Sequence, residues 1–528
     1  MTRARRTVLA TVLATDLATG LVIGLVIAAH LAFLVVDVRL PRDLSLAHGS
    51  LPDLLASLQA GRIGPWLRSL VGPGGWYTGA YAAVLATLGV RPEVFGLVDL
   101  AWLTTVMAGG ALLARHLWGP RAGLIAALLL GSLPAVVVLA RESWIHLPEA
   151  GLVLVAANAW RASPARWRPG PTLVFVLASA AALALRPSGL VWLVPLGLAV
   201  ATDPARPHPR AWVPGIALVG LLPWLVRLPQ YLTAKLEARD RYLADVSPLP
   251  DQLRELLGGP GLVAVGLGLL LSLALPRRPG LRLLQAWALL PVLLFAVARA
   301  GIDNFILGIV AAALLAAGGL ARLSAGGVLL AAIAFALFTV PQWLPPTTPG
   351  IAAAGRLLHL ATRPALRNTY RPNRAWGLPQ LRALIEATCG ASACTVAVDQ
   401  GLSQPYGEEP GHLERIFLDP DRLELVELRA GPPDHPDRID ALIHYDCGGL
   451  DAAWRRRYPA SLDALTALLA DGRLQPAWSR QVDETCRPIW FTPGGEVAHP
   501  ERLPPGNDVR QRPPAAPTPH RPQPLAAP

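Results

Sequence analysis

The sequence is short of charged residues, and lysine is almost missing. Asp, Glu, Lys and Arg make up 16% of the 528 residues, against about 25% in an ordinary soluble domain. Lys235 is the single lysine, while 53% of the chain is hydrophobic and the mean hydropathy is +0.41. This balance excludes a disordered chain or a fibre. Long apolar stretches recur through the first two thirds, which predicts a protein that crosses a membrane many times.

Cysteine is absent from the membrane-like part of the chain. All four cysteines, Cys389, Cys394, Cys447 and Cys486, lie in the less hydrophobic remainder. An even number of cysteines confined to one segment predicts two disulfides in an oxidising compartment. Nearness in the sequence favours pairing Cys389 with Cys394 and Cys447 with Cys486. A zinc site is the alternative, although this spacing matches no zinc ribbon or finger.

The formal net charge of +11 does not indicate a nucleic-acid partner. Much of the basic surplus sits in short arginine-rich turns between apolar stretches, and no stripe of basic residues runs along one element. Such turns are typical of topology signals in membrane proteins, where cytoplasmic loops collect Arg and Lys. We therefore expect no nucleic acid among the partners and a lipid bilayer around the chain.

Eleven apolar stretches predict eleven membrane spans, and the basic start of the sequence, MTRARR, predicts a cytoplasmic N-terminus. They cover approximately residues 7–36, 97–116, 121–140, 147–161, 171–186, 188–202, 211–228, 259–275, 282–298, 303–321 and 325–342. Alternating sides then places fourteen arginines inside, whereas the short outer turns hold only Arg141, Arg186 and Arg299. That asymmetry follows the positive-inside rule. The alternative is that 171–186 and 188–202 form one tilted helix, which would invert every later loop.

An odd number of spans places the rest of the chain outside the cytoplasm. We predict a multi-span domain over 1–343, an extracytoplasmic domain over 344–503 and a disordered proline-rich tail over 504–528. In the second of these, helix patterns at 381–389 and 462–472 alternate with strand patterns at 395–400, 423–430 and 440–447. Alternation of this kind predicts a small α/β domain.

The first outer loop, about residues 37–96, is long where most other membrane loops are minimal. Long loops in compact proteins usually carry function. It places Asp37 and Asp43 just beyond the first span, and it continues into an aromatic, apolar segment that begins near Trp76 and Tyr77. That segment is suited to lie in the membrane interface before the second span turns inward.

The order of these features resembles that of GT-C glycosyltransferases that use polyprenyl-phosphate sugars, in the bacterial branch related to protein O-mannosyltransferases and aminoarabinose transferases. The similar stretches are 41–48, 72–90, 111–150 and, more weakly, 185–195. The resemblance implies a polytopic α-helical GT-C fold in the bacterial cytoplasmic membrane. It also implies an inverting transfer from a polyprenyl-phosphate-linked sugar to a glycan, lipid or protein at the outer face.

The resemblance also implies where the acids of the site lie. The family's general base is an acid of the first outer loop, which points to Asp43, with Asp37 as second choice. A helix N-cap is the structural alternative for Asp43. Relatives carry a second acid just before a Leu-Pro pair, where this chain has His146, so Glu142, His146 or Glu149 are the candidates. Alternatively, His146 and Glu149 are interfacial and Glu142 pairs with Arg141.

The phosphate of the donor needs cations, and guanidinium groups suit it through paired donors. The candidates are Arg141, Arg186 and Arg299 of the short outer turns, together with His146; snorkelling at a helix end is the alternative for each arginine. Contacts to the acceptor, or a flap over the site, are expected from the first outer loop and from the loop 229–258. The residues concerned are Trp76, Tyr77, Tyr231, Lys235 and Arg239. The second loop equally fits a solvated amphipathic helix.

Two other functions remain open from the sequence. A transporter or flippase would place ionisable groups near the middle of spans and often shows repeated halves, whereas these spans are nearly free of charge and no repeat is visible. A scaffold with an outer ligand-binding domain leaves the length and acids of the first outer loop unexplained. Metal dependence stays undecided, because no carboxylate cluster has the required spacing.

Overall fold

The computed structural model divides into two compact units, residues 1–373 and 374–528. The structure describes residues 3–36, 51–70, 75–137, 140, 146–162, 169–203, 219–225, 253, 257, 259–275, 279–298, 306–343, 377–398, 423–428, 432–446, 459–479 and 487–502. The predicted domain limits at 343/344 and 503/504 fall at or beyond the edges of these ranges and stay predictions.

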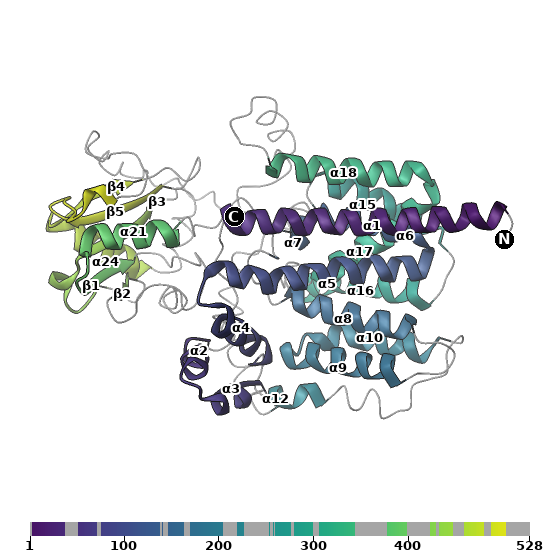
Figure 1. Cartoon of the computed structure of the whole chain (residues 1–528), viewed down its shortest axis with the longest axis horizontal. Helices are drawn as coiled ribbons and strands as arrows, with labels where there is room; N and C mark the ends of the chain where they lie inside the picture. Colours follow the sequence, from purple (N-terminus) through teal and green to yellow (C-terminus); the bar gives the residue numbers. More distant parts are fainter. Residues whose placement is uncertain are drawn as a thin grey trace, which may run out of the picture. The chain divides into compact units, whose positions relative to one another are not determined.

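Unit 1 is entirely helical over its described residues (Figure 1). Three short helices follow the first long one: α2 (Leu51–Gln59), α3 (Ile63–Leu70) and α4 (Gly75–Leu88). The remaining elements are α1 (Arg3–Val36), α5 (Pro92–Trp118), α6 (Pro120–Gly131), α7 (Pro134–Val137), α8 (His146–Ala162), α9 (Pro169–Leu185), α10 (Gly189–Ala201), η2 (Val219–Leu221), α12 (Leu222–Leu225), α15 (Gly259–Ser272), α16 (Pro279–Ala298), α17 (Ile306–Leu320), η4 (Ala321–Leu323) and α18 (Ala325–Trp343).

The predicted spans lie on helices over most of their described residues, although the span 121–140 is divided between α6 and α7. Among the described residues, three helical stretches are long and apolar enough to cross a membrane, 10–31, 96–118 and 306–323, and six shorter apolar helices accompany them. The doubtful pair at 171–186 and 188–202 forms two helices, α9 and α10, because Pro187 interrupts the chain between them. Most of the predicted span 211–228 lies outside the described residues.

Burial identifies α17 as the centre of unit 1 and α1 as its edge. The most apolar stretch of α17 is 78% buried, against 56% for that of α5 and 17% for that of α1. α17 packs against α15 and α16, and α5 packs against α6 and α8. α1 instead leaves leucines exposed along one face, including Leu13, Leu17 and Leu21. An exposed leucine face on a membrane-length helix is what lipid contact requires.

Glycines allow α15 and α17 to approach closely. A Cβ atom at Gly268 would lie 2.6 Å from the Cα and Cβ of Ala316, whereas nothing lies within 4 Å of a Cβ at Gly266 on the same helix. Small residues at such crossings let two membrane helices pack backbone against backbone. The close packing of α15 on α17 therefore requires a glycine at position 268 and not at position 266.

We expect Gly268→Leu to destabilise unit 1 and Gly266→Leu to leave it unchanged. Forcing a larger side chain into a packed interior costs about 1–3 kcal/mol or more, while Gly266 faces open space in the structure. Thermal unfolding of the two purified variants in detergent measures the difference. Equal melting temperatures would contradict the described packing of α15 on α17.

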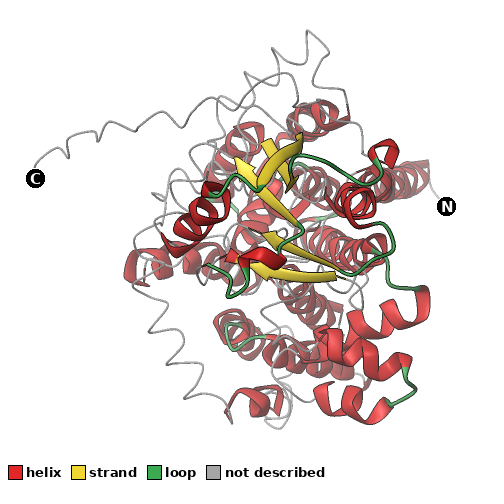
Figure 2. Cartoon of the chain, turned by 90° about the vertical axis from the view of Figure 1, so that its left-hand side faces the viewer, coloured by secondary structure: helices red, strands yellow, loops and turns green. Residues whose placement is uncertain are grey.

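Unit 2 is a small α/β unit, whose strands are drawn in yellow in Figure 2. Its described strands form one five-stranded sheet in the order β2-β1-β3-β5-β4. β1 (Cys394–Val398) pairs in parallel with β2 (Leu423–Glu427) and with β3 (Ala441–Asp446), and β5 (Arg487–Pro493) runs antiparallel to both β3 and β4 (Leu474–Ser479). Over the described residues of this unit, the α-helices are α21 (Gly377–Cys389) and α24 (Pro459–Ala470), and the short 3₁₀ helices are η7 (Pro436–Arg438) and η8 (Pro500–Arg502). α24 contributes Ala464 and Leu468 to the core of the sheet.

One predicted disulfide is confirmed. Cys389 at the end of α21 is bonded to Cys394 at the start of β1, with Cα atoms 5.9 Å apart. Cys447 and Cys486 lie outside the described residues. They are the sequence neighbours of Asp446 and Arg487, which are paired in the antiparallel register of β3 and β5. The predicted second disulfide would extend this ladder by one pair.

Peptide mapping under non-reducing conditions should therefore recover a peptide that links Cys447 to Cys486. The same digest should contain the Cys389–Cys394 bridge, which serves as the internal control. Recovery of Cys447 and Cys486 as separate alkylated thiols would show that the second prediction is wrong.

Candidate active site

Two segments meet at one end of the helix bundle. One is the first turn of α8, which begins at His146 and carries Glu149. The other is the tight turn Arg186-Pro187-Ser188 between α9 and α10. Pro187 cannot continue α9, and Ser188 precedes α10 without capping it through its side chain. The turn therefore leaves the side chains of Arg186 and Ser188 available for contacts with α8.

Four polar side chains form a connected cluster here: His146, Glu149, Arg186 and Ser188. We call it the outer cluster, after the side of the membrane that the predicted topology assigns to it. Arg186 Nη1 lies 2.6 Å from Nδ1 and 2.5 Å from Nε2 of His146. Nδ1 of His146 is 3.5 Å from Oε2 of Glu149, and the Ser188 hydroxyl donates a hydrogen bond of 2.8 Å to Oε1 of Glu149.

Burial makes the outer cluster unusual for a membrane protein. His146 is 4% exposed and Glu149 is 2% exposed. A carboxylate inside a helix bundle costs several kcal/mol unless it is paired and hydrogen-bonded. Here the neighbouring histidine, arginine and hydroxyl supply that pairing. Buried ionisable groups in membrane helices mark functional sites by default.

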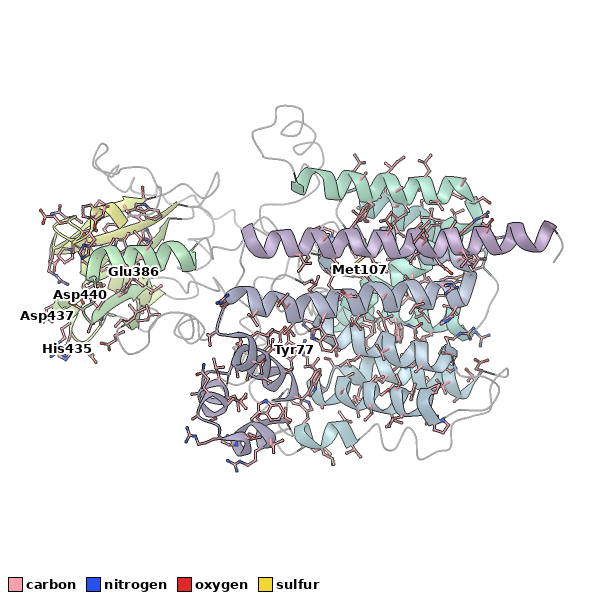
Figure 3. The ribbon with its side chains drawn as sticks, in the orientation of Figure 1. Tyr77, Met107, Glu386, His435, Asp437 and Asp440 are labelled. Carbon is pink, nitrogen blue, oxygen red and sulfur yellow. A yellow bond between two sulfur atoms is a disulfide. The ribbon has the colours of Figure 1, made fainter. Side chains whose placement is uncertain are left out.

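An aromatic residue of α4 contacts α9, the helix that leads to Arg186. Trp76 donates a hydrogen bond from Nε1 to the carbonyl of Ala181, 3.2 Å away and five residues before Arg186. Its ring also makes an edge contact with Trp102 of α5, with centroids 6.1 Å apart. Tyr77, labelled in Figure 3, is only 1% exposed. α4 therefore contacts both α5 and the last turn of α9.

A buried hydrogen-bond chain connects α4 to the start of α5. The Tyr81 hydroxyl donates to Oδ1 of Asp99 over 2.5 Å, and the hydroxyls of Tyr77 and Tyr81 are 3.3 Å apart. Burial is the main cause that raises the pKa of Tyr81 well above its usual range, and the charge of the nearby Asp99 adds to it. Tyr81 therefore stays protonated and remains a donor at neutral pH.

An apolar pocket of about 470 Å³ lies further along the same helices. It is bounded by α5, α8 and α9, with Gly109, Val155, Asn158 and Val174 among its lining residues. Asn158 is eleven positions beyond Leu147 on α8, about 16 Å at the helical rise.

The structure brings together three of the candidates, His146, Glu149 and Arg186. It also buries Tyr77 and places Trp76 beside α9. The remaining candidates lie outside the described residues: Asp37, Asp43, Arg141, Glu142, Tyr231, Lys235, Arg239 and Arg299. Their predicted roles stay predictions. Within the described ranges, no group of three or more His, Cys, Asp or Glu side chains is placed to hold a metal ion.

Sequence reasoning missed the partners that complete these contacts. Ser188 was not a candidate, and Glu149 was only one of three candidates for the second acid of the site. Ser188 and Glu149 are 39 residues apart, and no local pattern links them. Tyr81 lies in the predicted interfacial segment and Asp99 in the predicted span 97–116, and both stretches are otherwise apolar. A buried acid within the first turns of a predicted span is the signal that Glu149 and Asp99 share.

Comparison with known proteins gives a fold and no closer relative. No family model matches the sequence, and no curated protein matches it. Among solved structures, the chain is similar to ArnT from Cupriavidus metallidurans bound to undecaprenyl phosphate, with 16% identity, a TM-score of 0.51, and coverage of 91% of this chain and 98% of that one. The apo form of ArnT gives 17% identity, a TM-score of 0.50, and coverage of 92% and 99%. The chain therefore has the fold of the GT-C glycosyltransferases.

Proposed function

We propose that the chain is an integral-membrane glycosyltransferase that moves a sugar from a polyprenyl-phosphate donor to an acceptor at the outer face of the bacterial cytoplasmic membrane. The observation that carries the proposal is the outer cluster, a buried arginine–histidine–carboxylate group at the helix ends, within a fold that it shares with ArnT. ArnT has been solved with undecaprenyl phosphate, which motivates the class of donor proposed here.

Arg186 is the proposed contact to the donor phosphate. Its guanidinium offers several N–H donors, and the rim of a membrane bundle strengthens each contact because the surroundings have a low dielectric constant. His146 and Glu149 hold Arg186 in place through the contacts described above. Arg141 and Arg299, which sequence parity assigns to the same side, are further candidates for the phosphate.

The prenyl chain of the donor is proposed to run along α8 into the apolar pocket. The pocket and Arg186 are contributed by the same pair of helices, α8 and α9 with its following turn. A polyprenyl chain is apolar and long, so it fits a membrane-embedded pocket that presents Val155, Ala159 and Val174.

Transfer is proposed to proceed by inversion at the anomeric carbon. Asp43 accepts the proton of the acceptor hydroxyl or amine as that group attacks, the bond from the anomeric carbon to the phosphate oxygen breaks, and the phosphate leaves with its negative charge toward Arg186. Asp37 is the reserve base and Glu142 the candidate second acid. Trp76, Tyr77, Tyr231, Lys235 and Arg239 are proposed to line the acceptor side or to form a flap.

The position of the buried charges favours an enzyme over a transporter. Transporters place their ionisable residues near the bilayer midplane. In this chain Glu149 lies in the first turn of α8, and Asp99 lies within the first ten residues of α5. Both acids are therefore nearer the N-terminal ends of their helices, which the predicted topology places at the outer face.

Lipid binding tests the proposed donor class without knowledge of the sugar. Purified protein should bind undecaprenyl phosphate saturably and at least about tenfold more tightly than undecaprenol, which lacks the phosphate; tenfold corresponds to one charge-assisted contact. Equal affinity for the two lipids would mean that the helices take up a long lipid without recognising phosphate, and the proposed function would fail.

A further inference from the structure

Helix α4 is attached to α5 by the chain of hydrogen bonds from Tyr77 through Tyr81 to Asp99. All three groups are enclosed: Tyr77 is 1% exposed, Tyr81 0% and Asp99 4%. The proposed reaction uses none of these hydroxyls or the Asp99 carboxylate directly. A buried acid that takes no part in the proposed chemistry therefore needs another explanation.

The direction of the hydrogen bonds in this chain can be assigned. A carboxylate only accepts, so the hydroxyl hydrogen of Tyr81 goes to Asp99. Tyr81 has no second hydrogen to give, and its oxygen accepts the hydrogen of Tyr77 over 3.3 Å. The two rings also make an edge contact, with centroids 4.9 Å apart. Asp99 thus fixes the orientation of two aromatic side chains on successive turns of α4.

The same helix also contacts α9, the helix that precedes the turn bearing Arg186. Trp76 donates to the carbonyl of Ala181 in the last turn of α9, and Arg186 follows the end of that helix. The ring of Trp76 also contacts Trp102, which lies three residues after Asp99 on α5. α4 is therefore held between the start of α5 and the end of α9.

We propose that Asp99 is a positioning residue that fixes α4, and with it the turn bearing Arg186, for binding of the donor phosphate. The proposal rests on the proposed function of Arg186. It assigns Asp99 and Tyr81 no contact with substrate. Its consequence is that breaking one hydrogen bond at the start of α5 loosens α4 and weakens binding of the phosphate.

Two measurements on the full-length protein in detergent test this proposal: hydrogen exchange of residues 75–88 and affinity for undecaprenyl phosphate. Asp99→Leu, which has no acceptor, should raise exchange in α4 about tenfold or more and weaken binding about tenfold or more, since a hydrogen bond to a charged group is lost. Asp99→Asn keeps an oxygen that accepts from Tyr81, and both quantities should stay within about threefold of the wild-type values. Tyr81→Phe should resemble Asp99→Leu.

Exchange in α17 is the control for global unfolding and should not change in any variant. The proposal is overturned if Asp99→Leu leaves α4 exchange unchanged, if exchange rises without any loss of binding, or if Asp99→Asn is as damaging as Asp99→Leu. If exchange in α17 rises together with that in α4, Asp99 serves stability and the proposal is likewise wrong. Failure of the wild-type protein to bind undecaprenyl phosphate overturns the proposed function, and it is distinguishable because the exchange measurement needs no ligand.

Discussion

Replacing Asp43 with asparagine is expected to lower sugar transfer by about 100- to 10,000-fold, the range that a positioned general base contributes. Asparagine keeps the size and hydrogen-bonding capacity of the side chain, so a helix N-cap at this position would be retained. The carboxylate that takes the acceptor's proton would be lost. The measurement is the amount of the cell-surface sugar that depends on this chain, compared between cells that produce the wild-type protein and the variant at equal membrane levels.

Asp37→Asn is the matched control for this experiment. It removes the same charge from the same outer loop, six residues earlier in the sequence, and should keep most of the surface sugar. If Asp37→Asn abolishes transfer and Asp43→Asn does not, the base is Asp37. Full transfer in both variants would remove both acids of the first outer loop from the proposed chemistry.

Replacing Arg186 with glutamine is expected to weaken binding of undecaprenyl phosphate by about 10- to 150-fold, which corresponds to about 1.5–3 kcal/mol for a charge-assisted hydrogen bond. Arg186→Lys should fall between this variant and the wild type, because an ammonium keeps the charge but loses the paired N–H geometry. Direct titration of the purified variants with undecaprenyl phosphate measures both effects.

Arg115→Gln is the control for loss of an arginine from unit 1. Arg115 lies in the last turn of α5, at the other end of that helix from Asp99, and pairs with Asp16 at 2.8 Å. Its substitution should leave the affinity for undecaprenyl phosphate within about threefold of the wild-type value, since partly exposed ion pairs contribute little. An equal loss of binding in Arg115→Gln and Arg186→Gln would mean that the effect on Arg186 is not local.

Much of unit 1 could be predicted from the sequence because membrane helices are specified by long apolar stretches. The helices observed at α5, α8, α9 and α10 match the predicted spans to within a few residues. The separation of α9 from α10 follows from Pro187, which a single helix would have to absorb at a cost of about 3 kcal/mol.

Two strands of unit 2 were not predicted, and proline explains why. β4 contains Pro476, where its pairing with β5 is irregular, and β5 contains Pro488 and Pro493. Proline within a short apolar run argues against a strand, because it cannot donate to the ladder. The sheet tolerates these residues at strand ends and at a bulge, positions that only the paired structure reveals.

The contacts of the site depend on tertiary packing that a single sequence does not contain. The resemblance to GT-C enzymes led to His146 and Arg186 as candidates, but their contact joins residues 40 apart. Glu149 became prominent only once its burial and its hydrogen bond from Ser188 were known. The same holds for Asp99, whose partner Tyr81 lies on a different helix.

The most direct test of the proposed activity is to measure polyprenyl-phosphate sugars and surface glycans in cells that lack this chain. If the chain consumes a lipid-linked sugar, its deletion should make one polyprenyl-phosphate sugar accumulate while one surface sugar disappears. The wild-type protein should reverse both changes, and Asp43→Asn should reverse neither. Unchanged levels of every polyprenyl-phosphate sugar and of every surface sugar after deletion would contradict the proposed glycosyltransferase activity.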